Sequence, residues 1–310
     1  MTKKFRVRVP ASTANLGPGF DTLGVALQLY LYLEVEIIPT GLSVELTGEG
    51  AEKLPENSDN LIYRTMKSLF DKAGFEPPGL KLQVHNQIPL QKGLGSSAAA
   101  IVSGLVAANE LCGLPYSRDE LLSMAVELEG HADNVTPALF GGLTISYLGQ
   151  NGKVGCRKVT LSEKIRLVLV IPEICLSTSK ARTVLPKEVP LEDAVFNVQK
   201  TAILIEALRT GNFNLLGEAM QDRLHQPYRK KLVPQVEKVF SAGLDAGACG
   251  VAFSGSGPTI AAFCQNREDE IGKAMKKAFE MQGVAAHAYS LEIDHQGAEV
   301  SHSGGCGVES

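Results

Sequence analysis

The sequence predicts an α+β fold made of two domains. At 310 residues, the chain is longer than a single hydrophobic core usually supports. Strand-like and helix-like segments do not alternate regularly along it, which argues against a parallel α/β sheet. In the second half they follow the order βαββαβ, which is typical of ferredoxin-like domains.

The first half contains strands, a glycine-rich loop and capped helices. Residues 5–9 (FRVRV) alternate like a strand and run into the loop ASTANLGPGFDTLG. Glycines that commonly end helices follow the helical patterns, and Ser117 with Glu120 forms a capping box. The predicted elements are strands at 5–9, 29–38, 42–47, 80–88 and 141–148 and helices at 60–74, 97–111 and 118–129.

A polar, glycine-containing stretch at 149–164 separates the two halves, and we place the domain boundary there. The predicted elements beyond it are strands at 165–171 and 284–291, paired strands around 249–264, and helices over 191–222, 231–246 and 268–282. We therefore expect domains at residues 1–160 and 161–300. The remaining tail, 301–310, is rich in small polar residues and predicted to be flexible.

The composition excludes several classes of protein. A net charge of −4 offers no broad attraction to nucleic acid or to an anionic membrane. No apolar run approaches the roughly 20 residues that span a bilayer, and charges interrupt the start MTKKFRVRVP. The six cysteines are scattered without a CxxC pair, which favours reduced thiols. We expect a cytoplasmic protein with neither nucleic-acid nor membrane partners.

The stretch PLQKGLGSSAAA at 89–100 has the features of a phosphate-binding loop. Glycines permit a close backbone approach, and the N-terminus of the following helix attracts anions. It is not a dinucleotide-binding fingerprint, because four residues separate the strand from the first glycine. It is not a Walker A loop either, because no GK[ST] follows. Tight packing of a helix through small residues is the alternative that needs no ligand.

Four motifs carry a resemblance to a known family. PLQKGLGSSAA resembles the phosphate loop of the GHMP small-molecule kinases. VPASTANLGPGFDTLG at 9–24 and GVAFSGSGPTIAAF at 250–263 are similar to the other two motifs of that superfamily, in the same order. EGHADNVTPALFGGL at 129–143, together with STSKAR and HQPYR, resembles the homoserine kinase family within it.

The resemblance implies a fold and an activity. The fold is an S5-domain-2-like α/β domain followed by a ferredoxin-like domain. The activity is transfer of phosphate from ATP, with Mg²⁺, to the side-chain hydroxyl of L-homoserine, a step toward threonine. A homodimer is also implied. Two other readings remain open, namely another small alcohol as substrate, or a catalytically silent nucleotide-binding regulator on the same fold.

Ser97, Glu129 and Asn134 are the candidate catalytic residues, and the first two are the candidate metal ligands. Glu129 lies on the core side of the helix 118–129, whereas Glu127 lies on the solvent side. A buried carboxylate suits a metal ligand, although a solvent-facing position at the helix end is the alternative. Asn134 stands where related kinases have an aspartate base, which implies direct attack by the substrate hydroxyl with late proton transfer to the phosphate.

The candidate binding residues fall into two groups. Arginines suit the substrate carboxylate, and acidic and amide side chains suit its ammonium. The alternatives that need no ligand are local turn chemistry for Asn15 and Asp21 and a structural role for His131. Asn60 matches the adenine position of the superfamily or is a helix N-cap. The nucleotide candidates are Asn60, Pro89, Leu90, Gln91, Lys92, Gly93, Leu94, Gly95, Ser96, Ser97, Ala98 and Ala99. The substrate candidates are Asn15, Asp21, His131, Asp133, Arg182 and Arg229.

Overall fold

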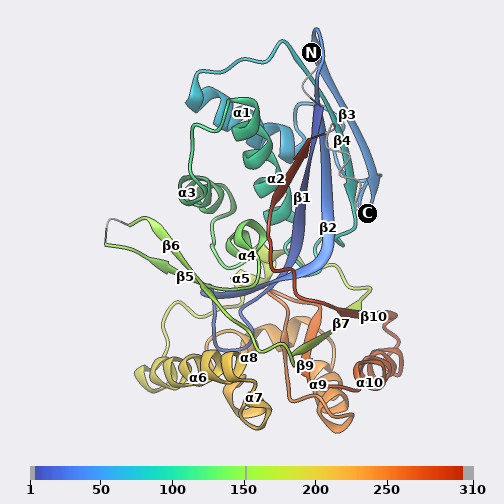
Figure 1. Cartoon of the computed structure of the whole chain (residues 1–310). Coiled ribbons are helices and arrows are strands. Elements are labelled where there is room, and N and C mark those ends of the chain that lie inside the picture. The colour runs from blue at the N-terminus through green and yellow to red at the C-terminus, as the bar shows by residue number, and fades with distance from the viewer. Residues whose placement is uncertain (1–3, 151, 303–310) are drawn as a thin grey trace, which may run out of the picture.

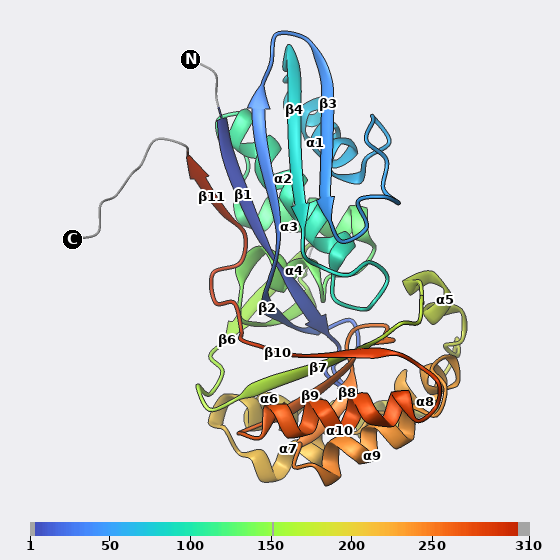
Figure 2. The same cartoon turned by 90° about the vertical axis from the view of Figure 1, so that its right-hand side faces the viewer.

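The protein folds into two lobes in the computed structural model, which describes residues 4–150 and 152–302 (Figures 1 and 2). The upper lobe of Figure 1 comprises β1 (Lys4–Ala14), β2 (Leu23–Ile37), β3 (Gly41–Gly48), α1 (Leu61–Ala73), β4 (Gly79–Asn86), α2 (Ser96–Leu111), α3 (Arg118–Glu129), α4 (Val135–Phe140), β5 (Leu143–Leu148) and β6 (Val154–Val159). The lower lobe comprises β7 (Arg166–Pro172), α5 (Thr178–Thr183), α6 (Leu191–Thr210), α7 (Phe213–Ala219), α8 (Gln226–Arg229), a 3₁₀ turn (Lys230–Leu232), α9 (Val236–Asp245), β8 (Gly250–Phe253), β9 (Ile260–Cys264), α10 (Glu268–Glu280) and β10 (Ala286–Leu291). The chain then returns to the upper lobe as β11 (Glu299–His302).

The upper lobe is a mixed sheet with helices α1 to α4 on one face (Figure 2). Its main strand order is β11-β1-β2-β4-β3, and β5 and β6 extend from β2 as a hairpin. Only β3 and β4 run parallel among the described strands, because α1 connects them. This helix begins at an N-cap and ends at a glycine. The Asn60 side chain accepts from the Ile62 amide, and Gly74 adopts φ +63° after the last turn.

The lower lobe is the predicted ferredoxin-like domain. Its four strands pair antiparallel in the order β10-β7-β9-β8, which is 4-1-3-2 by order of appearance. The strand β7 is apolar without alternation because both faces of this sheet are covered. Its Leu167 and Leu169 belong to the core shared with the upper lobe, whereas Val168 and Val170 pack in a second core with α9 and α10.

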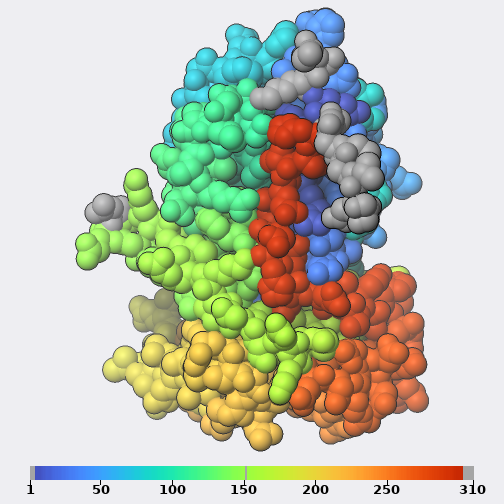
Figure 3. Space-filling model, in the orientation of Figure 1, coloured from blue at the N-terminus to red at the C-terminus, as the bar shows by residue number. Residues whose placement is uncertain are grey.

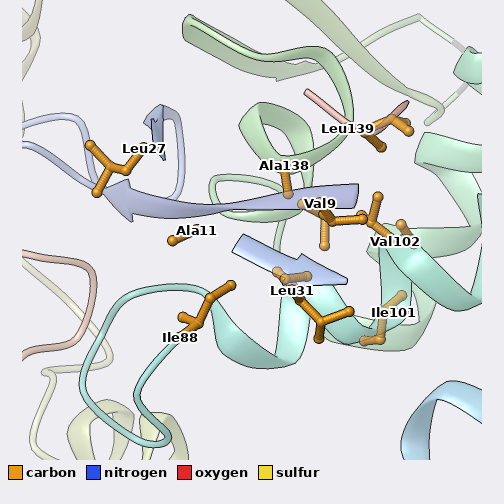
Figure 4. Close-up of a cluster of buried hydrophobic side chains, with 14 of the residues drawn as sticks. Val9, Ala11, Leu27, Leu31, Ile88, Ile101, Val102, Ala138 and Leu139 are labelled. Atoms are coloured by element: carbon orange, nitrogen blue, oxygen red, sulfur yellow. The ribbon is translucent and has the colours of Figure 1, made fainter. Parts of the chain in front are cut away.

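The strand β1 connects the sheet of the upper lobe to the junction between lobes. Up to Val9 it alternates between buried and exposed side chains, but Pro10 to Ala14 are buried on both faces. Figure 4 shows Val9 and Ala11 among core side chains that include Leu31 and Val102. We predicted that residues 11–14 belong to a loop, and this was wrong: they pair with β2 beyond a register shift at Pro10/Ala11.

Other differences from the predicted elements concern exposed or short segments. The polar stretch 149–164 is not simply a linker, because it contains β6, which pairs with β5. Ser301 and His302, expected in a flexible tail, pair with β1, and Figure 3 shows this last segment in red running up over the first lobe. The rest of that tail, 303–310, lies outside the described residues. The short helices α4, α5 and α8 were not predicted.

Among the described residues, none of the helices combines the length and the apolar character that a membrane span requires. Among the cysteines within the described ranges, 156, 175, 249 and 264 are free thiols. Cys306 lies outside those ranges.

Candidate active site

A single cavity between the two lobes gathers most of the predicted site residues. The upper lobe contributes the loop 89–97 and the segment 129–134, and the lower lobe contributes α5, α8 and the loop between β8 and β9. We call it the central cavity. Its walls are formed by Asn15, Asp21, Pro89, Gln91, Lys92, Gly93, Leu94, Gly95, Ser96, Ser97, Glu129, His131, Asp133, Asn134, Ser177, Thr178, Arg182, Arg229, Gly255 and Ser256.

The loop before α2 is shaped by left-handed glycines and held from both lobes. Gly93 and Gly95 have φ +76° and +70°, a region that favours glycine. Gly95 has no side chain to cap α2, so the first amides of this helix have no side-chain acceptor. The Leu94 carbonyl accepts from the Ser12 amide at 3.1 Å, and the Gly93 carbonyl accepts from Ser254 Oγ at 2.7 Å. The loop 254–259 is therefore both a turn between β8 and β9 and a support for this loop.

Lys92 is oriented away from the helix N-terminus. Its Nζ donates to the carbonyl oxygens of Pro172 and Ile174, both at 2.8 Å, and burial lowers its pKa. Lys92 lines the central cavity, but its ammonium is bound to backbone of the lower lobe. Its contacts in this structure join the lobes.

Glu129 and Ser97 form a hydrogen-bonded pair in the wall of the central cavity. Ser97 Oγ donates to Glu129 Oε2 at 2.7 Å. The side chain of Glu129 is only 12% exposed, and burial raises its pKa, partly offset by the Ser97 hydrogen bond and by His131. Glu127 is exposed and lies outside the cavity walls. The prediction that Glu129 lies on the buried side of α3 and Glu127 on the solvent side is therefore correct.

His131, Asp133 and Asn134 follow directly at the end of α3. His131 Nδ1 lies 2.8 Å from Asp133 Oδ1, and its Nε2 lies 3.7 Å from Glu129 Oε1. Burial acts to lower the pKa of His131, but the hydrogen bond and charge of Asp133, with Glu129, outweigh it and raise the pKa. Asn134 Oδ1 accepts from Ser12 Oγ at 2.9 Å, which fixes the orientation of this amide.

The predicted arginines both face the central cavity, with different partners. Arg182 forms a bidentate pair with Asp21, with Nη–Oδ distances of 3.0 and 2.6 Å. Arg229 is 1% exposed and donates from Nη1 to the Gly255 carbonyl at 3.1 Å. Burial, with repulsion from Arg182, lowers the pKa of Arg229 to about 10. The ring of Phe20 lies under both guanidinium groups, 5.5 and 5.2 Å from their carbons.

Asn15 lies in the wall of the central cavity, whereas four other predicted residues lie outside that wall. Asn15 supports its wall by donating to the Gly255 carbonyl at 2.8 Å and accepting from the Asp21 amide at 2.9 Å. Asn60 and Leu90 line a second, mostly apolar cavity whose wall also includes Gln91, Ser96 and Ser97. Ala98 and Ala99 are fully buried and line neither cavity.

Five further residues line the central cavity or contact its walls and were not predicted from the sequence: Ser12, Phe20, Ser177, Thr178 and Ser256. Each lies inside one of the quoted motifs. What was missing was the side-chain direction, which depends on how the lobes pack.

Comparisons with known proteins show the family to which the chain belongs. The model of the GHMP kinases N-terminal domain matches residues 60–142, and that of the GHMP kinases C-terminal domain matches residues 204–280. A homoserine kinase of Moorella thermoacetica is 47% identical over 295 residues, 95% of this chain and 99% of its own. The chain belongs to the homoserine kinase family. A homoserine kinase of Caldanaerobacter subterraneus is also 47% identical, over 95% of both chains.

The fold of this family extends over nearly the whole chain. The crystal structure of homoserine kinase from Cytophaga hutchinsonii superposes with a TM-score of 0.87 at 31% identity, covering 96% of this chain and 98% of that one. Both lobes and the junction between them are therefore those of a homoserine kinase. The expected fold, family and enzyme class are confirmed.

Proposed function

We propose that this homoserine kinase transfers phosphate from ATP, with Mg²⁺, to the side-chain hydroxyl of L-homoserine. The observation that supports it most strongly is the central cavity itself. Its walls combine an uncapped helix N-terminus and the Ser97–Glu129 pair with two arginines and two aspartates. The first group suits a polyphosphate and forms the proposed phosphate end, and the second suits a small zwitterion and forms the proposed amino-acid end.

The apolar cavity is the proposed place for the adenine of ATP. It shares Gln91, Ser96 and Ser97 with the phosphate end of the central cavity, so a nucleotide can occupy both. Asn60 lies in its wall, but its side chain is already used: Oδ1 accepts from the Ile62 amide and Nδ2 donates to the Pro55 carbonyl. We therefore propose that Asn60 shapes this cavity mainly by holding the start of α1 against the Pro55 segment.

Ser97 and Glu129 are the proposed magnesium ligands. Among the described residues, no three His, Cys, Asp or Glu side chains gather as a metal site, so the protein offers few ligands. A hydroxyl and one carboxylate fit the way Mg²⁺ is usually held beside phosphates, with the phosphates and waters as the other ligands. The raised pKa of Glu129 fits this role too, because a buried carboxylate is relieved by a cation.

Arg229, Arg182, Asp21 and Asp133 are the proposed contacts of the amino-acid end. The arginines suit the carboxylate, and the aspartates suit the ammonium. Because Arg182 is paired with Asp21 in this structure, a bound zwitterion would replace one ion pair by two new ones. A ligand that carries only one of the two charges would leave one member of this pair without a partner.

Asn134 is the proposed positioning group for the hydroxyl that reacts. ATP supplies the phosphoryl group, and Mg²⁺ neutralises charge on its oxygens during transfer. The Asn134 amide cannot take up a proton at neutral pH, so its contribution is orientation. The Asp133 carboxylate is bound by His131 Nδ1, which keeps it from acting as a free base. The attack is therefore direct, without a strong protein base, and the hydroxyl proton passes late to the transferred phosphate.

The domain boundaries near residue 160 and the homodimer stay predictions. Domain boundaries can be tested by limited proteolysis, and the dimer by light scattering.

A coupled assay of ADP release tests the proposed function. The purified enzyme is supplied with ATP and Mg²⁺ and, in separate reactions, with homoserine, mevalonate, galactose or shikimate. We expect turnover with homoserine and little with the others, which lack the ammonium. Turnover of another alcohol with none of homoserine would refute the substrate, and nucleotide binding without turnover of any alcohol would indicate a regulator.

A further inference from the structure

His225 is a fully buried histidine that contacts a proposed substrate-binding arginine. It immediately precedes α8, and its carbonyl accepts from the Arg229 amide at 3.0 Å, so the two side chains lie one helical turn apart. The Arg229 Nη1 lies 3.1 Å from His225 Nδ1. On the other side of the ring, Nε2 lies 2.7 Å from the carbonyl oxygen of Gly17. Phe20 stacks on the imidazole with ring centroids 5.1 Å apart.

These two neighbours determine the protonation of the imidazole. A carbonyl oxygen only accepts, so Nε2 must carry a proton; a guanidinium only donates, so Nδ1 must be bare. His225 is therefore neutral, in the Nε2–H tautomer. Asp222 Oδ2 lies 3.5 Å from Nε2, but this carboxylate accepts from the amides of residues 224, 225 and 226 and from Asn197 Nδ2. Burial is the largest influence and lowers the pKa of His225. The negative charges of Asp222 and Asp21 act to raise this pKa, and the positive charge of Arg229 acts to lower it.

The two arginines thus differ in how their charge is balanced. Arg182 is held by a carboxylate, which largely neutralises it. Arg229 is held by a neutral imidazole and by the carbonyls of Gly255 and Ala181 (Nε–O 3.4 Å), none of which carries a charge. A neutral acceptor can orient a guanidinium and still leave its positive charge for a ligand.

We infer that His225 is a positioning residue, a neutral hydrogen-bond acceptor that aims Arg229 at the substrate carboxylate without cancelling its charge. This inference rests on the proposed function of the central cavity. Two requirements follow from it. The acceptor must stand at the Nδ1 position, and it must be uncharged.

Matched substitutions separate these requirements from a merely structural role. His225→Asn keeps an acceptor near the Nδ1 position, whereas His225→Gln keeps a donor near the Nε2 position and loses the acceptor. We expect His225→Gln to raise the KM for homoserine about tenfold, as the loss of a hydrogen bond to a charged group would, while the KM for ATP stays within about twofold. His225→Asn should keep both values near those of the wild type.

His225→Asp, of the same shape as His225→Asn, tests the requirement for neutrality. Its carboxylate would pair with Arg229, so the KM for homoserine should rise although the melting temperature does not fall below that of His225→Asn. A carboxyl-free substrate, 3-aminopropan-1-ol, gives a second readout: the preference for homoserine over it should shrink in the Gln and Asp variants and persist in the Asn variant.

Three results would overturn the inference. One is an equal change in the KM for homoserine in the Asn and Gln variants. Another is a KM for homoserine that rises in proportion to the loss of melting temperature across the Asn, Gln and Asp variants. The third is equal KM values for the Asn and Asp variants, which would refute the requirement for neutrality. Absence of homoserine turnover by the wild-type enzyme, measured first, would refute the proposed function and with it the inference, so the two failures are distinguishable.

Discussion

Gly93→Ala tests whether the phosphate loop depends on contact with the lower lobe. A Cβ at residue 93 would lie 2.2 Å from the Ser254 carbonyl oxygen and 2.9 Å from that of Gly257. Both atoms are backbone, so no rotamer change can relieve the overlap. The loop 254–259 would have to move away, and the hydrogen bond from Ser254 Oγ to the Gly93 carbonyl would stretch or break.

Gly113→Ala is a matched control for the backbone strain. Gly93 has φ +76° and Gly113 has φ +82°, but a Cβ at residue 113 would meet no atom within 4 Å. Both substitutions therefore carry the cost of a left-handed alanine, about 1–2 kcal/mol. Only Gly93→Ala adds an overlap in a packed region, about 1–3 kcal/mol more. The difference between the two variants measures the contact between the lobes.

Urea denaturation and steady-state kinetics give the two readouts. We expect Gly113→Ala to lower the unfolding midpoint modestly and to leave the KM for ATP unchanged. Gly93→Ala should lower the midpoint further and raise the KM for ATP, because the amides at the start of α2 are displaced. Equal midpoints and equal KM values in the two variants would show that the loop does not depend on this contact.

Three further predictions concern side chains of the two cavities. Because burial raises the folded-state pKa of Glu129 above its ordinary value of 4.5, its ionised form destabilises the fold as the pH rises through and above that value. Glu129→Gln should therefore raise the melting temperature at pH 7 but not at pH 4, and it should nearly abolish turnover. The control Glu127→Gln should change neither the melting temperature nor the turnover. A wild-type kcat in Glu129→Gln would exclude Glu129 as a metal ligand. Asn60→Ala should lower the free energy of unfolding by about 1 kcal/mol because the helix N-cap is lost, whereas the control Asn60→Asp retains the cap. Equal denaturation curves for the Ala and Asp variants would contradict this prediction. Arg182→Met should raise the KM for homoserine and leave that for ATP unchanged in initial-rate measurements, and an unchanged KM for homoserine would exclude a contact with the carboxylate.

Elements with local signals were predictable from the sequence. The helix α3 begins at a capping box and ends at a left-handed Gly130, both encoded within a few residues. The apolar run of β7 likewise indicated a buried strand. By contrast, β6 is polar and only partly buried, so its sequence resembles a loop, and its strand character comes from pairing with β5. The strand β11 is recognisable only by its partner almost 300 residues away, β1.

The site was predictable as segments but not as contacts. The motifs named the loop before α2 and the residues at the end of α3, because glycine, serine and acidic side chains at those positions suit phosphate and metal. The bidentate pair of Asp21 with Arg182 joins residues 161 apart in sequence, and the contact of His225 with Gly17 joins residues 208 apart. Such pairs depend on how the lobes pack, and no single segment of the sequence encodes them.

The return of β11 to the edge of β1 has a consequence for biosynthesis. Phe5 pairs with His302, so residue 5 leaves the ribosome almost 300 residues before the partner that completes this side of the sheet. Until then the edge of β1 is an unpaired strand, which invites association with other chains. A message truncated before residue 299 would encode every wall of both cavities and still yield a protein with an open sheet edge. The four residues of β11 line neither cavity, yet they are needed to cover the edge of the sheet.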